Sequence, residues 1–407
     1  MKPNQNVLLA AILLLSANMR MPILVVSPLL PLINQTYHLT NSESGLLTSI
    51  PLLVFGLLSM AVPNASKRLG LGRFIILAII AIGGGEFLRY LPSPSMLFTG
   101  TLLLALGITV GNVMIPAMIR GFFPNKVNAA TAYYTALMQG MTTLALLLVV
   151  PMTQLLGWRI TIVSFGILSI FTLLLWLRFY NLRIADSLPS ATASPLTTAP
   201  KPITNKPSTT SHPTIKSVFS QRLAWDVSLF MGVQSLVFYT LSTWIPTAVL
   251  SHHLSLTFAG QMASLFQFIA VIASLLVPFW LKKYTVQSWP AVWLTMCYLI
   301  ASIGFFWGSG QTIMILSSII GGIGSGGTFA VALLFFSLRT QSAESSAIIS
   351  GTGQSIGYLL AAIGPSAIGY LYDSFNGWSM VSLTMIIFCL LFAYFGYRSG
   401  KNTYINK

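Results

Sequence analysis

Residues 7–33 read VLLAAILLLSANMRMPILVVSPLLPLI, and Arg20 is the only ionisable side chain in this apolar run. A membrane-spanning helix needs about 20 such residues, so the run is long enough to cross a bilayer. Arg20 lies 13 residues beyond Val7, which in a helix carries it about 20 Å into a hydrocarbon layer about 30 Å thick. A guanidinium at that depth costs at least about 2.5–3.5 kcal/mol and keeps its charge. The run therefore predicts a membrane span whose buried cation serves a function.

The composition of the whole chain agrees with a membrane protein. Of its 407 residues, 55% are hydrophobic and 7% are charged, and the mean hydropathy is +0.80. These values exclude an ordinary soluble globular protein. We predict an all-α integral membrane fold in which short connections join antiparallel helices. The twelve predicted spans cover residues 7–33, 44–63, 73–91, 95–119, 129–156, 158–181, 222–250, 257–281, 287–308, 310–338, 344–371 and 377–398.

The net charge of +15 indicates orientation in the membrane rather than binding to nucleic acid. Lysines and arginines gather after every second span and at the C-terminus, whereas the alternate loops are nearly free of them. By the positive-inside rule both termini are then cytoplasmic, with Arg159 as the one exception. We expect a multi-pass protein of a bacterial plasma membrane, in contact with the lipid bilayer and without a nucleic-acid partner.

A segment rich in Pro, Ser and Thr interrupts the apolar pattern at residues 184–220. Such a composition does not bury a core, so we predict a flexible cytoplasmic linker. The linker separates an N-terminal half of six spans, residues 1–183, from a C-terminal half of six spans, residues 221–407.

The two halves repeat each other at an offset of 215 residues. PLINQTYHLT (31–40) aligns with PTAVLSHHLS (246–255), and without a gap VPNASKR (62–68) aligns with VPFWLKK (277–283). Farther along the chain, Gln139 aligns with Gln354 at the same offset. The repeat predicts two six-helix halves related by internal duplication.

Two six-span halves joined by a cytoplasmic linker resemble the plan of a major facilitator superfamily transporter. The resemblance implies a substrate site near mid-membrane between the halves, and alternating access by rocking of one half against the other. The superfamily's loop signature between spans 2 and 3 is only partly kept in Ala65-Ser66-Lys67-Arg68-Leu69-Gly70, where Lys67 replaces the usual acidic residue. A gate that depends on that carboxylate is therefore not predicted.

Longer motifs in both halves resemble the cyanate/2-nitroimidazole transporter family. They are Asn18-Met19-Arg20 with Pro28-Leu29-Leu30-Pro31, GNVMIPAMIRGFFPNKV (111–127) with Thr131 and Tyr134, LAWDVSLFMGVQSLVFY (223–239) with Trp244-Ile245-Pro246, and SGTGQSIGYLLAAIGP (350–365) with Asp373 and Gly377-Trp378. Members of this family move small polar or anionic molecules. The resemblance implies a substrate of that kind, and it makes Asn112 and Tyr134 candidate contacts.

The repeat also predicts what surrounds Arg20. Its counterpart at the 215-residue offset is Ser235, with Gln234 beside it, so one half offers a charge and the other offers hydrogen bonds. Such a site suits a small monoanion, or a neutral ligand with a strongly polar end. We therefore expect Arg20 to anchor the substrate. The alternative is that Arg20 bonds to helix-end carbonyls or to a neighbouring helix.

Other polar and aromatic side chains at similar depth are candidate ligand contacts. Gln139 and Gln354 would bind either a ligand or a neighbouring helix, and Tyr358 follows Gln354 one turn later. Tyr239 and Trp244 would stack on a flat heterocycle, although Trp244 would serve equally as an interface anchor. The predicted substrate-binding residues are Arg20, Asn112, Tyr134, Gln139, Gln234, Ser235, Tyr239, Gln354 and Tyr358.

The six acidic residues limit the choice of a proton-coupling group. Glu86 is plainly inside a span, and it precedes Arg89 by three residues, a spacing that favours an ion pair on one helix face. Asp226, just inside the seventh span, is the second candidate. If the driving force is a proton gradient, we expect one of these two carboxylates to carry the proton.

No nucleophile with a base and no cluster of metal ligands is recognisable, so we predict neither an enzyme nor a metal or other cofactor. Cys297 and Cys389 both fall inside spans and indicate no disulfide. One alternative function is a broad-specificity drug exporter of the same fold with a mainly apolar pocket, suggested by Met19, Met21 and Phe329. A channel is disfavoured, because duplicated halves and a flexible linker suit rocking. One chain holds both halves, so a monomer suffices.

Overall fold

The computed structural model describes residues 5–181, 215–341 and 343–405, and helices form nearly all of their regular structure. Twelve helical segments are long and apolar enough to cross a membrane, which confirms the predicted all-α membrane fold. The elements up to residue 181 are α1 (Gln5–Ala17), α2 (Met21–Leu24), η1 (Ser27–Leu29), α3 (Leu30–Tyr37), α4 (Asn41–Leu58), α5 (Val62–Leu69), α6 (Leu71–Tyr90), α7 (Pro94–Phe122), η2 (Pro124–Lys126), α8 (Val127–Leu156), α9 (Trp158–Phe165) and α10 (Ile167–Asn181). The elements after residue 214 are α11 (Ile215–Phe219), α12 (Arg222–Ser251), α13 (Leu256–Leu281), α14 (Ser288–Trp307), α15 (Gln311–Leu338), α16 (Ala343–Phe375) and α17 (Trp378–Ser399).

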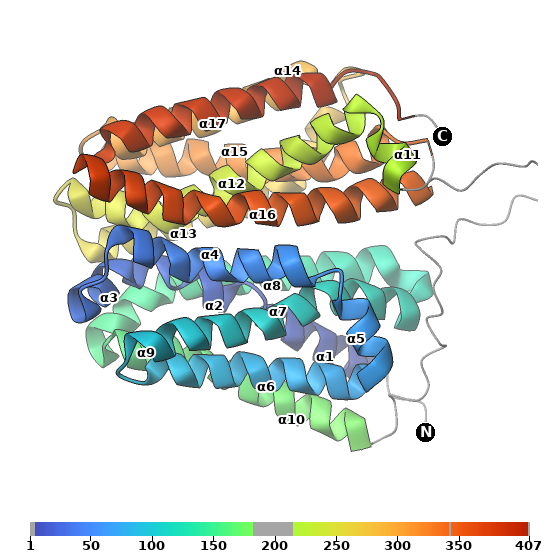
Figure 1. The fold of residues 1–407 in the computed structure, drawn as a ribbon, viewed down its shortest axis with the longest axis horizontal. Helices are drawn as coiled ribbons and strands as arrows, with labels where there is room; N and C mark the ends of the chain where they lie inside the picture. Colours follow the sequence, from blue (N-terminus) through green and yellow to red (C-terminus); the bar gives the residue numbers. More distant parts are fainter. Residues whose placement is uncertain (1–4, 182–214, 342, 406–407) are drawn as a thin grey trace, which may run out of the picture.

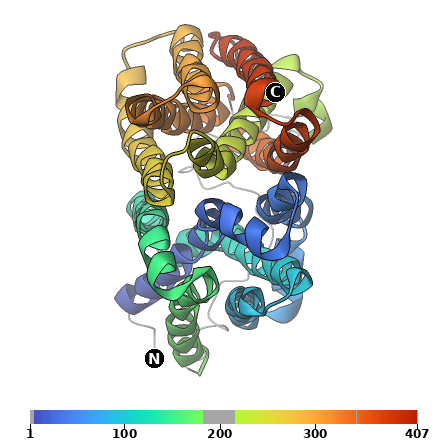
Figure 2. The ribbon, with the colours of Figure 1, turned by 90° about the vertical axis from the view of Figure 1, so that its left-hand side faces the viewer.

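These elements form two groups that lie side by side. Figure 2 shows α1–α10 in one group and α11–α17 in the other, and in Figure 1 the long helices of both groups run roughly parallel to one another. The predicted linker, residues 184–220, lies outside the described residues up to residue 214, and α11 occupies part of its end. The half boundaries at residues 183 and 221 therefore stay predictions.

Local geometry repeats at the same 215-residue offset as the sequence. His38 and His253 both end a helical segment in the left-handed region, with φ of 54° and 59°. Thr40 and Ser255 then cap α4 and α13, each accepting a bond from the backbone N–H three residues later. Because a side chain with a Cβ rarely adopts a left-handed backbone, two such residues at one offset support an internal duplication independently of residue identity.

The first span is not the single helix that the sequence predicts. It is divided into α1, α2, η1 and α3, with a turn at Asn18–Arg20 between α1 and α2. Pro22 and Pro28 lie at the starts of α2 and η1, where a missing backbone N–H is tolerated. Prolines therefore divide the span, and Arg20 lies at a break rather than on a regular helix.

The second span also ends earlier than predicted. α4 stops at Leu58, and a separate helix, α5, carries Lys67 and Arg68 in its last turn. The stretch that the sequence predicts as a loop is thus helical up to Leu69. Pro63 favours a new helix start, and Gly70, with φ of 79°, ends it in a conformation that glycine adopts at little cost.

Candidate functional site

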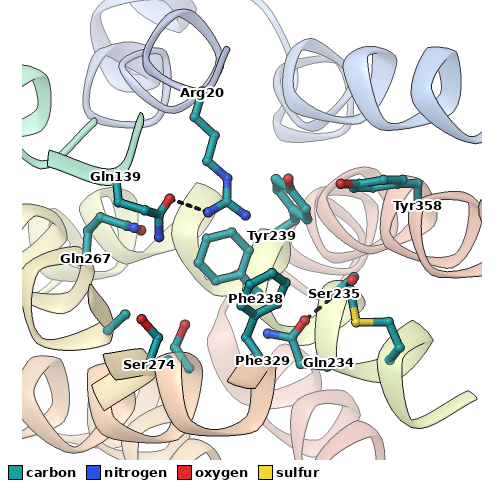
Figure 3. Close-up of a pocket in the computed structure, with 14 residues that line it drawn as sticks. Arg20, Gln139, Gln234, Ser235, Phe238, Tyr239, Gln267, Ser274, Phe329 and Tyr358 are labelled. Atoms are coloured by element: carbon teal, nitrogen blue, oxygen red, sulfur yellow. Dashed lines mark hydrogen bonds between the residues drawn. The ribbon is translucent and has the colours of Figure 1, made fainter. Parts of the chain in front are cut away.

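A pocket opens between the two groups of helices, and Arg20 faces it. Figure 3 shows the guanidinium reaching between Gln139 on one side and Tyr239 on the other, above the ring of Phe238. The pocket draws on the α1–α2 turn and on α8, α12, α13, α15 and α16. Its lining residues are Arg20, Gln139, Met231, Gln234, Ser235, Phe238, Tyr239, Gln267, Ala270, Ser274, Ser325, Gly326, Phe329 and Tyr358.

Arg20 keeps its positive charge uncompensated in this pocket. Its Nη1 donates a 2.5 Å hydrogen bond to Oε1 of Gln139, and its Cζ lies 5.2 Å from the ring centroid of Phe238. Both contacts are with neutral groups. Within residues 5–181, 215–341 and 343–405, the ion pairs are Glu86–Arg89 and Asp226–Arg398. The pocket therefore offers a cation without a carboxylate partner.

Buried polar contacts fix both sides of the turn that carries Arg20. On one side, Asn18 donates to Oγ1 of Thr172 at 3.0 Å and accepts from Oγ of Ser169 at 2.9 Å. On the other side, Nη1 of Arg89 donates to the carbonyl of Pro22 at 2.9 Å. A helix break frees backbone groups that lipid does not satisfy, so such partners are required at this depth. They anchor the turn to α10 and α6 and so orient Arg20.

The wall formed by α12 and α13 supplies neutral hydrogen-bonding groups. Gln234 and Ser235 are nearly fully buried on α12, and Oγ of Ser235 donates to Oε1 of Gln234 at 3.5 Å. Gln267, on α13, is 2% exposed, and its Nε2 has no hydrogen-bond partner among the residues that the structure describes. Amide and hydroxyl groups both donate and accept, so this wall suits the polar end of a small ligand.

Aromatic rings form the remaining wall. Phe238 and Tyr239 contact each other edge to face, with centroids 4.9 Å apart, and Tyr358 packs edge to face on Phe55 of α4 at 5.5 Å. Phe329 of α15 completes the aromatic lining. Rings in such contacts are held in place and offer flat apolar surfaces to a ligand.

The pocket brings together six of the nine predicted substrate-binding residues, namely Arg20, Gln139, Gln234, Ser235, Tyr239 and Tyr358. Asn112, Tyr134 and Gln354 do not line it. Tyr134 packs against the main hydrophobic cluster, and Nε2 of Gln354 donates to Oγ of Ser350 in its own helix at 3.1 Å. Trp244 is buried and donates to the carbonyl of Pro365 at 3.0 Å, so it joins α12 to α16 rather than facing this pocket.

The two candidate proton-coupling carboxylates lie outside the pocket lining. Glu86 is 1% exposed and pairs with Arg89 at 3.4 Å, which confirms the contact that the spacing predicts. One of its oxygens, Oε1, has no hydrogen-bond partner in the described part of the chain. Asp226 accepts a 2.9 Å bond from Nε of Arg398, which joins α12 to α17. Glu86 is connected to the Arg20 turn through Arg89, whereas Asp226 has no described connection to it.

The sequence analysis did not predict several of the lining residues. They are Met231, Phe238, Gln267, Ala270, Ser274, Ser325 and Gly326. Gln267 could have been predicted as a site residue, because an amide within an otherwise apolar span is energetically costly unless it has a role. Phe329 appeared only in support of an apolar pocket, and Met19 and Met21, named with it, are buried and do not line the pocket. The described residues contain no grouping of three or more His, Cys, Asp or Glu side chains suited to a metal ion.

Comparisons with known proteins agree with a membrane carrier. A family model described as Major Facilitator Superfamily matches residues 8–365. The chain is 32% identical over 400 residues to the 2-nitroimidazole transporter of Escherichia coli (strain K12), covering 98% of this chain and 96% of that protein. It is 22% identical over 366 residues to a cyanate transport protein of the same organism, covering 89% of each.

Among solved structures, the fold matches that of a bacterial homolog of the human lysosomal transporter Spinster in an inward-facing, unoccupied conformation. The TM-score is 0.78 at 14% sequence identity, and the match covers 98% of both chains. At this identity the likeness concerns the fold alone. Together with the family match, it identifies the scaffold on which the Arg20 pocket is built.

Proposed function

The chain belongs to the Major Facilitator Superfamily, and on that premise we propose that it is a secondary transporter for a small anion or polar heterocycle. Within the described residues, twelve helical segments are long and apolar enough to span a membrane. Together with the bacterial transporter relatives, they identify the chain as a multi-pass plasma-membrane transporter rather than an enzyme. Movement is by alternating access, with the pocket between the halves exposed to one side of the membrane at a time. Arg20 anchors the substrate.

The uncompensated charge of Arg20 carries this proposal. A cation within a membrane span normally acquires a carboxylate partner, because its desolvation is otherwise costly. Here its hydrogen-bond partner is the amide of Gln139, and a ring covers one face. An anionic or nitro oxygen entering the pocket would meet a preformed donor and the charge that the protein leaves unpaired.

The names of the relatives support the same ligand class. One relative is named a 2-nitroimidazole transporter and another a cyanate transport protein. A nitro ring and a cyanate ion share a compact, electron-rich end, and that end matches a site with one guanidinium and several neutral donors. A second cation, which a multiply charged ligand would favour, is not among the residues that line the pocket.

The competing function is a broad-specificity drug exporter of the same fold. Phe238, Tyr239 and Phe329 give it some support, because they offer apolar surface in the pocket. An exporter of this type would bind many apolar or cationic compounds without using Arg20. The two functions therefore differ in whether binding depends on the guanidinium.

A ligand screen on the purified protein in detergent tests the proposal. Cyanate, benzoate, 2-nitroimidazole and a cationic drug are scored by thermal stabilisation, which at about 100 times Kd amounts to about 2.7 kcal/mol. We expect anions or nitro compounds to stabilise the native protein and to fail with Arg20→Gln. Arg159→Gln is the matched control, because Arg159 stacks on Tyr37 and Trp158, outside the pocket. Stabilisation of both Arg20 forms by cationic drugs alone would favour the exporter.

A further inference from the structure

Gln267 has a buried donor that no protein atom satisfies. Its side chain is 2% exposed and lines the pocket from α13, and its Nε2 lacks a hydrogen-bond acceptor within the described part of the chain. A buried N–H without a partner is unfavourable, because nothing replaces the hydrogen bond that it makes with water. Native proteins rarely keep such a group unless a ligand or water completes it.

The unsatisfied amide lies on the same side of the pocket as the arginine and its partner. In Figure 3 Gln139 lies beside the guanidinium of Arg20, and Gln267 lies on the other side of Gln139. Gln139 uses its carbonyl oxygen for Arg20, so the group that it still presents to a ligand is its –NH2. Hydrogen-bond donors therefore gather at the α8–α13 side of the pocket, and none of these three residues adds a negative charge.

Another side of the same pocket is aromatic. Phe238, Tyr239, Phe329 and Tyr358 line it, and Phe238 sits directly beneath the guanidinium. A linear triatomic anion bound at the donors would leave these ring faces without a partner. A ligand that joins a planar two-oxygen group to a flat ring would occupy both sides at once.

We propose that Gln267 is a specificity-determining residue that binds the second oxygen of a ring-bearing carboxylate or nitro ligand, while Arg20 binds the first. The ring lies among the four aromatic side chains. The inference rests on the proposed function, and it narrows the ligand class from any small anion to a flat ring that carries a planar two-oxygen group. Carboxylate and nitro ligands share this chemistry and differ in charge.

The test compares Gln267→Leu with the native protein for three probes: benzoate, 2-nitroimidazole and cyanate. Leu is similar in size and fills the same space without a donor. We expect the Kd of benzoate or 2-nitroimidazole, or of both, to rise about tenfold, the effect of about one buried hydrogen bond. The Kd of cyanate should change less than about twofold, because one donor at Arg20 suffices for it. A rise in Kd for benzoate alone would indicate a carboxylate ligand. A rise in Kd for 2-nitroimidazole alone would indicate a nitro ligand.

Gln261→Leu is the matched control, because Gln261 is an exposed glutamine of the same helix that does not line the pocket. The unliganded Tm of each variant checks folding. Equal losses for cyanate and the ring ligands, or no loss for any probe, would overturn the role of Gln267. Tight binding of cyanate without binding of either ring ligand would also overturn the role of Gln267. If Arg20→Gln also left every affinity unchanged, the proposed function itself would fail, so the two failures are distinguishable.

Discussion

The surroundings of Arg20 interact favourably with its charge without neutralising it. The Gln139 carbonyl and the Phe238 ring each interact favourably with a guanidinium, and a cation–π contact contributes about 0.5–2 kcal/mol depending on desolvation. Neither partner is an anion. The interaction with a bound anion is therefore still available, and it would be lost if a carboxylate occupied the position of Gln139.

Gln139→Glu is expected to abolish anion binding while the protein still folds. The new carboxylate would lie within hydrogen-bond distance of the Arg20 guanidinium and would compete with any anionic ligand for it. We expect the Kd of benzoate or cyanate, measured by calorimetry, to rise more than about tenfold, since like charges in one site cost several kcal/mol. Gln139→Leu, which removes the hydrogen bond but adds no charge, should bind more tightly than Gln139→Glu. If Gln139→Glu bound the ligand more tightly than Gln139→Leu, the ligand would not interact with the charge of Arg20.

Glu86→Gln tests whether a proton is coupled to transport through the buried pair. Glu86 forms an ion pair with Arg89, and Arg89 donates a hydrogen bond to the Pro22 carbonyl at the turn that carries Arg20. A protonation change at Glu86 would therefore alter the contacts of the turn that carries Arg20. In proteoliposomes, we expect the variant to lose accumulation against a gradient and to keep substrate exchange. Equal losses in both assays, or normal accumulation, would show that Glu86 has no coupling role. Asp226→Asn serves as the comparison.

At the scale of single elements, the broken first span links the fold to the site. A regular helix through residues 7–33 would leave no free turn at Asn18–Arg20, and the carbonyl of Pro22 would need no partner from α6. The sequence was enough to predict that this span exists and that Arg20 lies deep within it. The break was harder to predict, because Pro22 and Pro28 fit equally well into a kinked helix, and the partners Thr172, Ser169 and Arg89 are distant in sequence.

Asn18→Ala is expected to loosen the turn without touching the pocket. Asn18 bridges α1 to α10 through Thr172 and Ser169, and losing buried hydrogen bonds of this kind costs about 1–3 kcal/mol. We expect a lower Tm in detergent and weaker anion binding. Asn64→Ala makes the same change at an exposed site on α5 and should leave both quantities unaltered. An unchanged Tm in Asn18→Ala would contradict the anchoring role of these bonds.

The pocket was predictable where a residue is unusual in its own span, and not where it is ordinary. Arg20 and Gln139 are conspicuous in apolar segments, and Gln234 and Ser235 followed from the repeat. Phe238 and Phe329 are common in membrane helices and become site residues only through packing between the halves. Gln354 stays a prediction: it does not line this pocket, and its Nε2 donates to Ser350 within its own helix. Depth follows from sequence, whereas the direction of a side chain depends on tertiary packing.

At the scale of the whole molecule, the halves are joined most tightly at the end where α4 begins. Asp373 of α16 accepts a 2.6 Å bond from Nδ2 of Asn41 and a 3.0 Å bond from the backbone N–H of Ser42. A carboxylate at a helix start is favoured by the helix dipole. Nearby, a Cβ added to Gly45 would lie 2.5 Å from the Pro365 carbonyl, so only glycine permits this approach of α4 to α16 (Figure 1). Under the proposed alternating access, these contacts would break in each cycle.

Asp373→Ala should therefore shift the population towards states that are open at this end. Ser49→Cys provides the probe, because Ser49 is 1% exposed and accepts a 2.9 Å bond from Oγ of Ser366 in the other half. We expect a polar maleimide to modify the introduced thiol about tenfold faster when Asp373→Ala is added, which corresponds to a population shift of about 1.4 kcal/mol. The parent without Ser49→Cys gives the background from Cys297 and Cys389, both buried.

Glu43→Ala distinguishes separation of the two halves from local unwinding at the start of α4. Glu43 belongs to the capping box with Thr40 at the start of the same helix, and its bonds stay within its own half. If the Asp373 contacts join the halves, labelling accelerates in Asp373→Ala and remains slow in Glu43→Ala. Equal acceleration in both variants would mean that the helix start merely unwinds. Since ligand binding favours the state that holds it, benzoate should also change the labelling rate in the native background, and Arg20→Gln should remove that effect.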